Sequence, residues 1–117
     1  MNTQILLTLN LTDDTILLNE GVLTALDWPR QVQMLWNKDE KMLLLRACTV
    51  DDLQAVVVPE SETAMIEISG RSLLRKIRKM VGWEDSKPRV CAGEYLPIAQ
   101  AVRFSLADAQ IIDAEPQ

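Results

Sequence analysis

The feature that most constrains this chain is a series of short apolar segments, each a few residues long and separated by polar turns. The first two segments, residues 5–11 and 16–18, lie on either side of Thr12-Asp13-Asp14-Thr15. Apolar runs rich in β-compatible residues and bounded by turn residues are typical of paired strands. The opening of the sequence therefore predicts a strand, an acidic turn and a returning strand.

A short helix is predicted directly after this hairpin. Asn19 is a good N-cap residue because its side chain can accept hydrogen bonds from the free amides of the first helical turn. Val22, Leu23 and Leu26 follow at helical spacing. Pro29 limits the helix, because the residue before a proline avoids the helical conformation. We expect a helix of about two turns.

A second hairpin is predicted after the helix. Val32, Met34 and Trp36 alternate with residues of the opposite face, which is typical of a half-buried strand. Residues 37–41 are polar and form the expected turn, and residues 42–46 form the returning strand.

The same order of elements then returns in the second half of the chain. Ile66-Glu67-Ile68-Ser69 echoes Ile16-Leu17-Leu18-Asn19, with Ser69 as the expected N-cap. Leu73 echoes Leu23 in a longer helix that ends near Gly82, and both leucines are expected to be buried. Trp83 follows this helix as Trp28 follows the first. We therefore predict an internal duplication in which the two tryptophans occupy corresponding places.

The predicted fold is mainly β with two short helices (α+β), built from two β-β-α-β-β halves within one compact domain. We expect the units to be a first half at residues 1–48, a linker at 49–54, a second half at 55–108 and an acidic tail at 109–117. A chain of 117 residues with 48% hydrophobic residues can form one well-packed core.

The compartment is predicted from what the sequence lacks. The N-terminus has no basic region followed by a long apolar core, which argues against a secretory signal. The longest apolar runs are far shorter than the roughly 20 residues of a membrane helix. We therefore expect a cytoplasmic protein without membrane contact. Cys48 and Cys91 are interpreted as small hydrophobic residues, although the sequence does not exclude a disulfide between them.

No catalytic, metal or cofactor site is predicted. The sequence contains no histidine, which removes the commonest general base and a leading metal ligand. No serine or cysteine lies in a nucleophile elbow, and no glycine-rich loop is present to bind phosphates. The adjacent pairs Asp13-Asp14 and Asp51-Asp52 lack the alternating spacing of a calcium loop, so turn and cap roles are favoured.

One segment carries a concentration of positive charge. Its basic residues, which are the candidate contacts for a nucleic acid or an acidic partner, are Arg71, Arg75, Lys76, Arg78 and Lys79. Residues three and four apart are neighbours on a helix, so these side chains share one face. The functional interpretation is an anion-binding face. The simpler alternative is a solvated face of an amphipathic helix, with Lys and Arg also favourable near its C-terminal end.

The three tryptophans admit two interpretations. They can provide a stacking surface for bases. Core packing is favoured instead, because Trp28 and Trp83 follow apolar helical runs and Trp36 shares a strand face with Val32 and Met34.

The order and length of residues 5–48 resemble the swapped-hairpin barrel of the AbrB and MazE family. The resemblance implies two copies that interleave their hairpins to form one barrel, with residues 55–108 supplying the second copy within the same chain. The sequence departs from the family where Gly-Arg is common in the first turn, because it has Asp13-Asp14-Thr15 there. The matching turn of the second copy contains Glu60 and Glu62. These acidic residues would repel phosphate, so the family's DNA contacts are not carried over.

The resemblance implies a DNA-binding transcription regulator or an antitoxin-type protein without enzymatic activity. The basic helix would then have to provide the DNA contact. A protein-interaction module on the same scaffold is the alternative, favoured by the acidic turns and the net charge of −5. A homo-oligomer is compatible with either function.

Overall fold

The computed structural model describes residues 4–48, 55–58 and 65–112 of the chain. These residues form a mainly β structure in which an antiparallel sheet curls into a half-barrel and carries two α-helices. The predicted linker at 49–54, the turn that contains Glu60 and Glu62, and residues 113–117 lie outside the described residues.

The first four predicted elements of the chain are confirmed. Strands β1 (Leu6–Asn10) and β2 (Thr15–Leu18) pair as an antiparallel hairpin. Helix α1 (Glu20–Ala25) follows, and the Asn19 side chain accepts a hydrogen bond from the amide of Val22 at 3.1 Å. The same side-chain oxygen accepts from the amide of Leu6 at 3.1 Å, so Asn19 also holds the helix against β1.

The second hairpin is also present. It consists of β3 (Gln31–Asn37) and β4 (Met42–Ala47), which pair antiparallel along their whole length. Val32 and Met34 are buried and Trp36 is half-buried, as the alternating pattern predicts. Lys41 closes the turn with a left-handed backbone (φ 54°).

The second half of the chain repeats this order. Its elements are β5 (Ala55–Val57), β6 (Ile66–Ser69), α2 (Arg71–Val81), β7 (Arg89–Leu96) and β8 (Ala101–Ser105), followed by a 3-10 turn (Leu106–Asp108) and β9 (Gln110–Ile111). Strand β7 is the longest of these strands, with eight residues. Strand β9 lies within residues 109–117, the segment expected to form the acidic tail, and pairs with β7.

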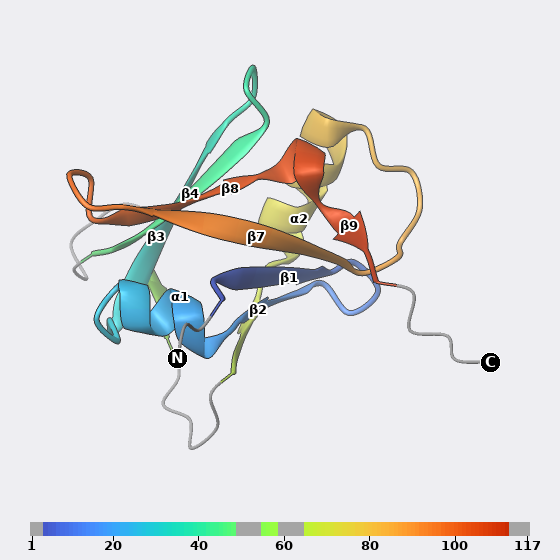
Figure 1. Ribbon diagram of the computed structural model, residues 1–117. Helices are drawn as coiled ribbons and strands as arrows, with labels where there is room; N and C mark the ends of the chain where they lie inside the picture. The colour runs from blue at the N-terminus through green and yellow to red at the C-terminus, as the bar shows by residue number, and fades with distance from the viewer. Residues whose placement is uncertain (1–3, 49–54, 59–64, 113–117) are drawn as a thin grey trace.

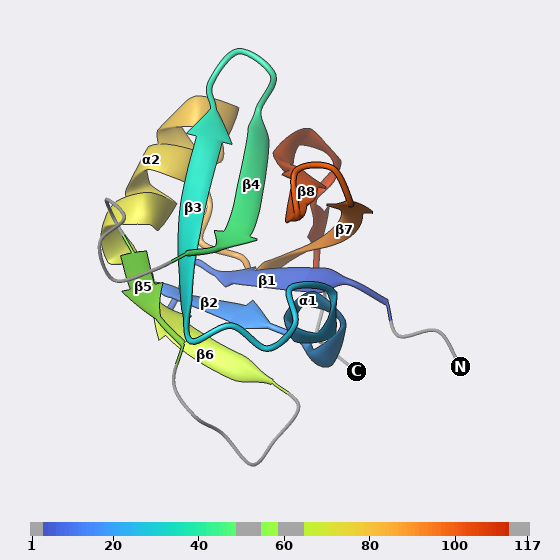
Figure 2. The same cartoon turned by 90° about the vertical axis from the view of Figure 1, so that its left-hand side faces the viewer.

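The strands lie in the order β5-β3-β4-β8-β7-β1-β2-β6, and β9 pairs with β7 beside this series. Hairpins of the two halves alternate in this order. Strand β1 of the first half pairs with β7 of the second, and β3 of the first half pairs with β5 of the second. Figure 1 shows β7 running along the front of the sheet above β1, with the β3–β4 hairpin projecting beyond it. In Figure 2, α2 lies beside β3, and α1 lies on the other side of the β3–β4 hairpin near β1.

The core lies inside the curl of the sheet and receives side chains from both halves. The largest fully buried side chains include Phe104 from β8, Leu45 from β4 and Leu7 from β1. Helix α1 contributes Val22 and Leu23, which are also fully buried. Since each half supplies only part of this apolar surface, the two halves depend on one another for a core.

Three expectations about individual residues are wrong. Ser69 belongs to β6, and the N-cap of α2 is Gly70, which has no side chain to accept a hydrogen bond. Leu73 is only half-buried, because the neighbouring Leu74 takes the inward position. Trp28 does not pack in the core but is 51% exposed, because the left-handed backbone at Asp27 (φ 61°) and at Trp28 itself (φ 49°) carries the chain away from the core.

The two leucines of α2 provide a test of the helix orientation. Replacing Leu74 by Ala is expected to lower the free energy of unfolding by about 2–5 kcal/mol, since the side chain is fully buried. Replacing Leu73 by Ala is expected to cost less than about 2 kcal/mol, because solvent already reaches that side chain. Urea denaturation of both variants measures the difference. Equal losses would show that the inward face of α2 is assigned incorrectly.

No helix among the described residues has the length and apolar character needed to cross a membrane. Neither Cys48 nor Cys91 forms a disulfide. Cys91 is buried, as predicted, and burial raises the pKa of its thiol to about 11. Cys48 is only half-buried.

Candidate functional site

Helix α2 is strongly amphipathic, which places its charged residues in solvent. Leu74 and Ile77 are buried against the sheet, and Leu73, Met80 and Val81 pack around them. Gly82 ends the helix with a left-handed backbone (φ 85°), and its amide bonds to the carbonyl of Arg78 at 2.8 Å. Glycine adopts this conformation without steric cost, so the sequence fixes where the helix ends.

All five predicted basic residues lie on α2, away from the buried side. Arg71, Arg75, Lys76 and Lys79 are exposed, and Arg78 is half-buried. The predicted clustering of these residues on one side of the helix is therefore present. Arg78 and Lys79 also lie in the last turn, where a positive charge interacts favourably with the helix dipole.

Two of the five side chains, Arg78 and Lys76, make contacts that stabilise the structure around α2. The Arg78 guanidinium donates to the backbone carbonyl of Asp85 at 2.9 Å, which ties the loop after α2 back to the helix. The Lys76 ammonium lies 4.9 Å from the centre of the Trp36 ring on β3, a cation–π contact that joins helix and sheet.

The remaining three residues are more available to a ligand. Arg71 approaches Asp14 at 3.8 Å, but both side chains are largely exposed and such a pair is weak. Arg75 and Lys79 have no carboxylate within 4.0 Å among the residues that the structure describes. These two side chains are therefore the strongest candidates for binding an anion.

Arg75 and Lys79 share a hollow with Trp83. The hollow has a volume of about 410 Å³, and its other lining residues are Lys76 and Arg78. Most of its lining is apolar, which indicates that the Trp83 ring and the aliphatic stems of the basic residues form its floor. We define the basic face as Arg75, Lys76, Arg78 and Lys79 together with Trp83.

A buried arginine fixes Trp83 in this position. The Arg89 guanidinium lies 4.3 Å from the centre of the Trp83 ring and is itself only 5% exposed. Asp85 accepts two hydrogen bonds from Arg89, at 2.9 and 3.0 Å. This bidentate pair lowers the pKa of Asp85 to about 2, with the Lys87 amide as a second donor. The Asp85–Arg89 pair thus anchors the loop that borders the basic face.

The depressed pKa of Asp85 predicts an acid-sensitive stability. A carboxyl group whose pKa is lower in the folded state contributes stability above its ordinary pKa of 3.8, and this contribution is lost as pH falls toward about 2. We expect the urea midpoint of the wild type to fall across this range more steeply than that of Asp85→Asn. Parallel curves for the two proteins would contradict the role given to Asp85.

Trp83 is a residue of this site that the predicted basic cluster did not include. A signal was present, because residues 75, 79 and 83 follow one another at helical spacing. Whether Trp83 lies beside Arg75 and Lys79 depends on the turn at Gly82, which ends the helix and which sequence spacing does not describe.

A second, apolar groove borders the same helix. It is lined by Met34, Trp36, Val56, Ser72 and Leu73 and has a volume of about 220 Å³. Because Lys76 contacts Trp36, the apolar groove and the basic face adjoin each other.

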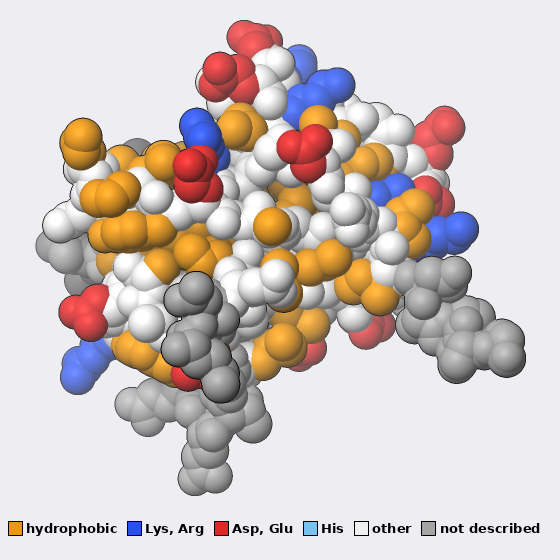
Figure 3. Space-filling model, viewed as in Figure 1, with side chains coloured by type: hydrophobic (Ala, Val, Ile, Leu, Met, Phe, Trp, Pro, Cys, Tyr) orange, Lys and Arg blue, Asp and Glu red, His pale blue; other side chains and the backbone are white. Residues whose placement is uncertain are grey.

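The face that carries β7 and β8 offers a contrast. Figure 3 shows that apolar side chains cover much of it, with acidic and basic side chains scattered between them. One of these basic groups, Arg103, is paired with Glu94. Among the described residues, no three His, Cys, Asp or Glu side chains come together as they would to hold a metal ion.

Comparison of this chain with protein-family models, with curated proteins and with solved structures found no match.

Proposed function

We propose that this chain is a non-enzymatic, DNA-binding domain of the AbrB or MazE type, in which two related halves form one swapped-hairpin barrel and the basic face contacts DNA phosphates. The architectural part of the proposal is supported by the pairing of β1 with β7 and of β5 with β3, since each pairing joins a first-half strand to a second-half strand. An exchange of this kind is what interleaved hairpins require.

The strand registers support a two-fold relation between the halves. Met34 pairs with Leu45, and Gly93 pairs with Phe104; the same interval along the chain separates Met34 from Gly93 and Leu45 from Phe104. The two hairpins therefore have the same register. Their turns also agree, because Lys41 and Gln100 are separated by that interval and both adopt positive φ angles, 54° and 51°.

Two further pairings lie where a two-fold axis would pass. Leu44 pairs with Arg103, its counterpart by the same interval. Leu17 pairs with Glu67, its counterpart in the echoed segments of β2 and β6. A residue that pairs with its own counterpart in an antiparallel ladder is expected at a two-fold axis and has no reason to occur twice by chance.

The two tryptophans share a backbone hydrogen bond but differ in the surroundings of their side chains. The amide of Trp28 bonds to the carbonyl of Leu23 at 2.7 Å, and the amide of Trp83 bonds to that of Arg78 at 3.1 Å, so each tryptophan follows its helix in the same way. Trp28 is half-exposed, whereas Trp83 packs against Arg89. The two halves thus differ at the surface, where a binding site present in only one half would be expected to differ.

The observation that carries the functional part is that Arg75 and Lys79, beside Trp83, have no carboxylate within 4.0 Å among the described residues. These two cations are available to bind phosphates. The chain as a whole has a net charge of −5 and repels phosphates, so binding would be directed to this face. The contact would be local, because Lys76 and Arg78 already contact Trp36 and the Asp85 carbonyl. It positions the protein on the backbone of DNA and does not read its sequence.

A salt titration tests this function. A fluorescently labelled mixed-sequence duplex is expected to bind at low salt, and two phosphate contacts predict a slope of about −1.8 for the logarithm of affinity against that of salt concentration. Absence of binding at low salt would refute DNA binding by the isolated chain.

The adjoining apolar groove favours a second candidate, the protein-interaction module. An acidic segment with one large apolar side chain would place that side chain between Trp36 and Leu73 and its carboxylates on the basic face. A protein that fails to bind DNA but binds such a peptide, with loss of binding in Trp36→Ala, would support this candidate.

A further inference from the structure

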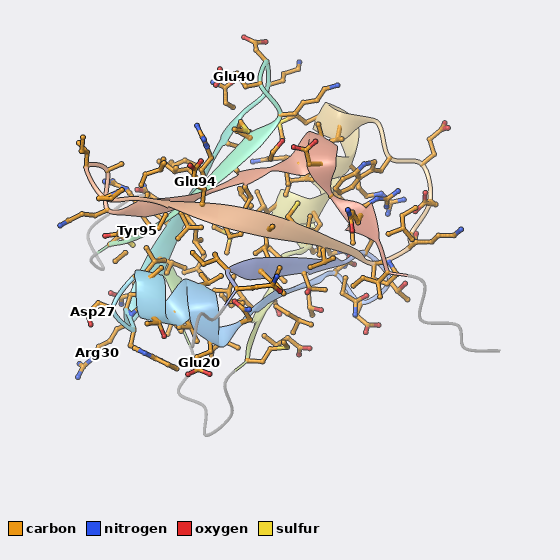
Figure 4. All side chains as sticks on the ribbon, in the orientation of Figure 1. Glu20, Asp27, Arg30, Glu40, Glu94 and Tyr95 are labelled. Atoms are coloured by element: carbon orange, nitrogen blue, oxygen red, sulfur yellow. The ribbon has the colours of Figure 1, made fainter. Side chains whose placement is uncertain are left out.

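A third hollow lies at helix α1, whereas the basic face lies at helix α2. It has a volume of about 290 Å³ and lies between the end of α1, the end of β4 and the turn that joins β7 to β8. Its polar lining residues are Asp27, Arg46, Tyr95 and Gln100. Figure 4 shows Tyr95 near the end of β7, directly above the end of α1 that carries Asp27.

Arg46 is held in place for binding. It lies on β4 between two paired strands, and its Nε group donates to the side-chain oxygen of Gln33 at 2.8 Å. Its two Nη groups have no hydrogen-bond acceptor among the described residues. A half-buried guanidinium with fixed Nε and available Nη groups is suited to bidentate recognition of a carboxylate.

Asp27 places an opposite charge at the same hollow. Its backbone amide bonds to the carbonyl of Thr24 at 3.1 Å, and its left-handed backbone (φ 61°) is unusual for a residue other than glycine. Its carboxylate has no cation within 4.0 Å among the described residues. Asp27 and Arg46 therefore line one hollow without neutralising each other.

The arrangement of the strands does not require an arginine at this place. By the strand registers above, Tyr95 is the counterpart of Trp36 and Arg46 is the counterpart of Ser105. The related position of the other half therefore carries a small neutral side chain instead of a guanidinium.

We infer that the hollow at α1 binds a small zwitterion of the amino-acid class. The ligand carboxylate accepts from the Nη groups of Arg46, and its ammonium group donates to the carboxylate of Asp27. Tyr95 and Gln100 contact the remainder of the ligand through a hydroxyl and an amide. The site does not depend on DNA binding by α2.

Amide NMR spectra of the ¹⁵N-labelled protein, titrated separately with each common L-amino acid, test this inference. At least one amino acid is expected to cause saturable shifts centred on the amides of Asp27, Ala47 and Gln100. Acetate and methylammonium, each of which carries only one of the two charges, are expected to bind about tenfold or more weakly.

Three variants locate the site. Arg46→Gln and Asp27→Asn are each expected to weaken binding by about tenfold or more, whereas Arg30→Gln, an exposed change outside the hollow, leaves it unchanged. If Arg46→Gln fails to fold, Asp27→Asn alone decides, because that side chain is exposed. The inference is overturned if no amino acid shifts these amides, if acetate binds equally well, or if Asp27→Asn binds like the wild type.

Discussion

Replacing Arg75 and Lys79 together by Glu is expected to abolish DNA binding at every salt concentration tested. Each substitution removes one phosphate contact and puts a negative charge in its place, so attraction to the DNA backbone becomes repulsion. Both side chains are exposed and have no carboxylate partner within 4.0 Å among the described residues, so the melting temperature should change little. Fluorescence anisotropy and thermal denaturation measure the two effects.

Arg78 is unsuitable for this experiment, although it belongs to the same predicted cluster. Its hydrogen bond to the Asp85 carbonyl supports the loop after α2, so its loss would change structure as well as charge. The matched control is Arg30→Glu with Lys38→Glu, which gives the same net charge at two exposed positions that flank β3. If the control loses as much affinity as the α2 variant, net charge and not the basic face governs binding.

Replacing Phe104 by Ala is expected to be the most destabilising single substitution in the chain, with a loss of about 3–5 kcal/mol. Phe104 is fully buried and lies opposite Gly93 in the β7–β8 ladder. Native domains have only about 5–15 kcal/mol of stability, so this loss would be a large fraction of the total. Urea denaturation followed by tryptophan fluorescence measures it.

The partner of Phe104 provides the control. A Cβ atom on Gly93 would lie 2.5 Å from the Phe104 ring, 2.7 Å from Val102 and 2.9 Å from Ile5, so Gly93→Ala alone destabilises the core. In the double variant the shortest of these contacts, the one with the ring, is removed. The two losses should therefore sum to more than the loss of the double variant. Strict additivity would show that the glycine and the ring do not share this space.

Local patterns in the sequence predict most of the elements in this fold. The alternation of Val32, Met34 and Trp36 identifies β3, and Asn19 identifies the start of α1, because both signals act within a few residues. The prediction that Ser69 is the N-cap of α2 is wrong because that signal is also local. It has the chemistry of an N-cap, but its pairing with Thr15 of β2 extends the strand and moves the cap to Gly70.

Side-chain environments were harder to predict than elements. Trp28 and Trp83 follow their helices with the same backbone hydrogen bond, yet only Trp83 meets an arginine that can hold it. That arginine comes from β7, and its position depends on the loop between α2 and β7. The hollow at α1 likewise combines residues from three elements that are distant in sequence. Spacing along the chain carries no information about such tertiary contacts.

The basic residues of α2 were predicted as a group, but their separate roles depend on tertiary contacts. Helical spacing places them on one side of the helix, and the structure then divides them. Arg78 supports a loop and Lys76 contacts Trp36, which leaves Arg75 and Lys79 as the available cations.

The most direct measurement of the central claim is a map of the DNA contact on the folded protein. Amide NMR spectra of the ¹⁵N-labelled chain, recorded at low salt with increasing amounts of a short duplex, locate the surface that DNA perturbs. Our account predicts the largest shifts in the second half of α2, around Arg75 and Lys79, and at Trp83. Shifts confined to α1 or to the β3–β4 turn, with α2 unaffected, would contradict it.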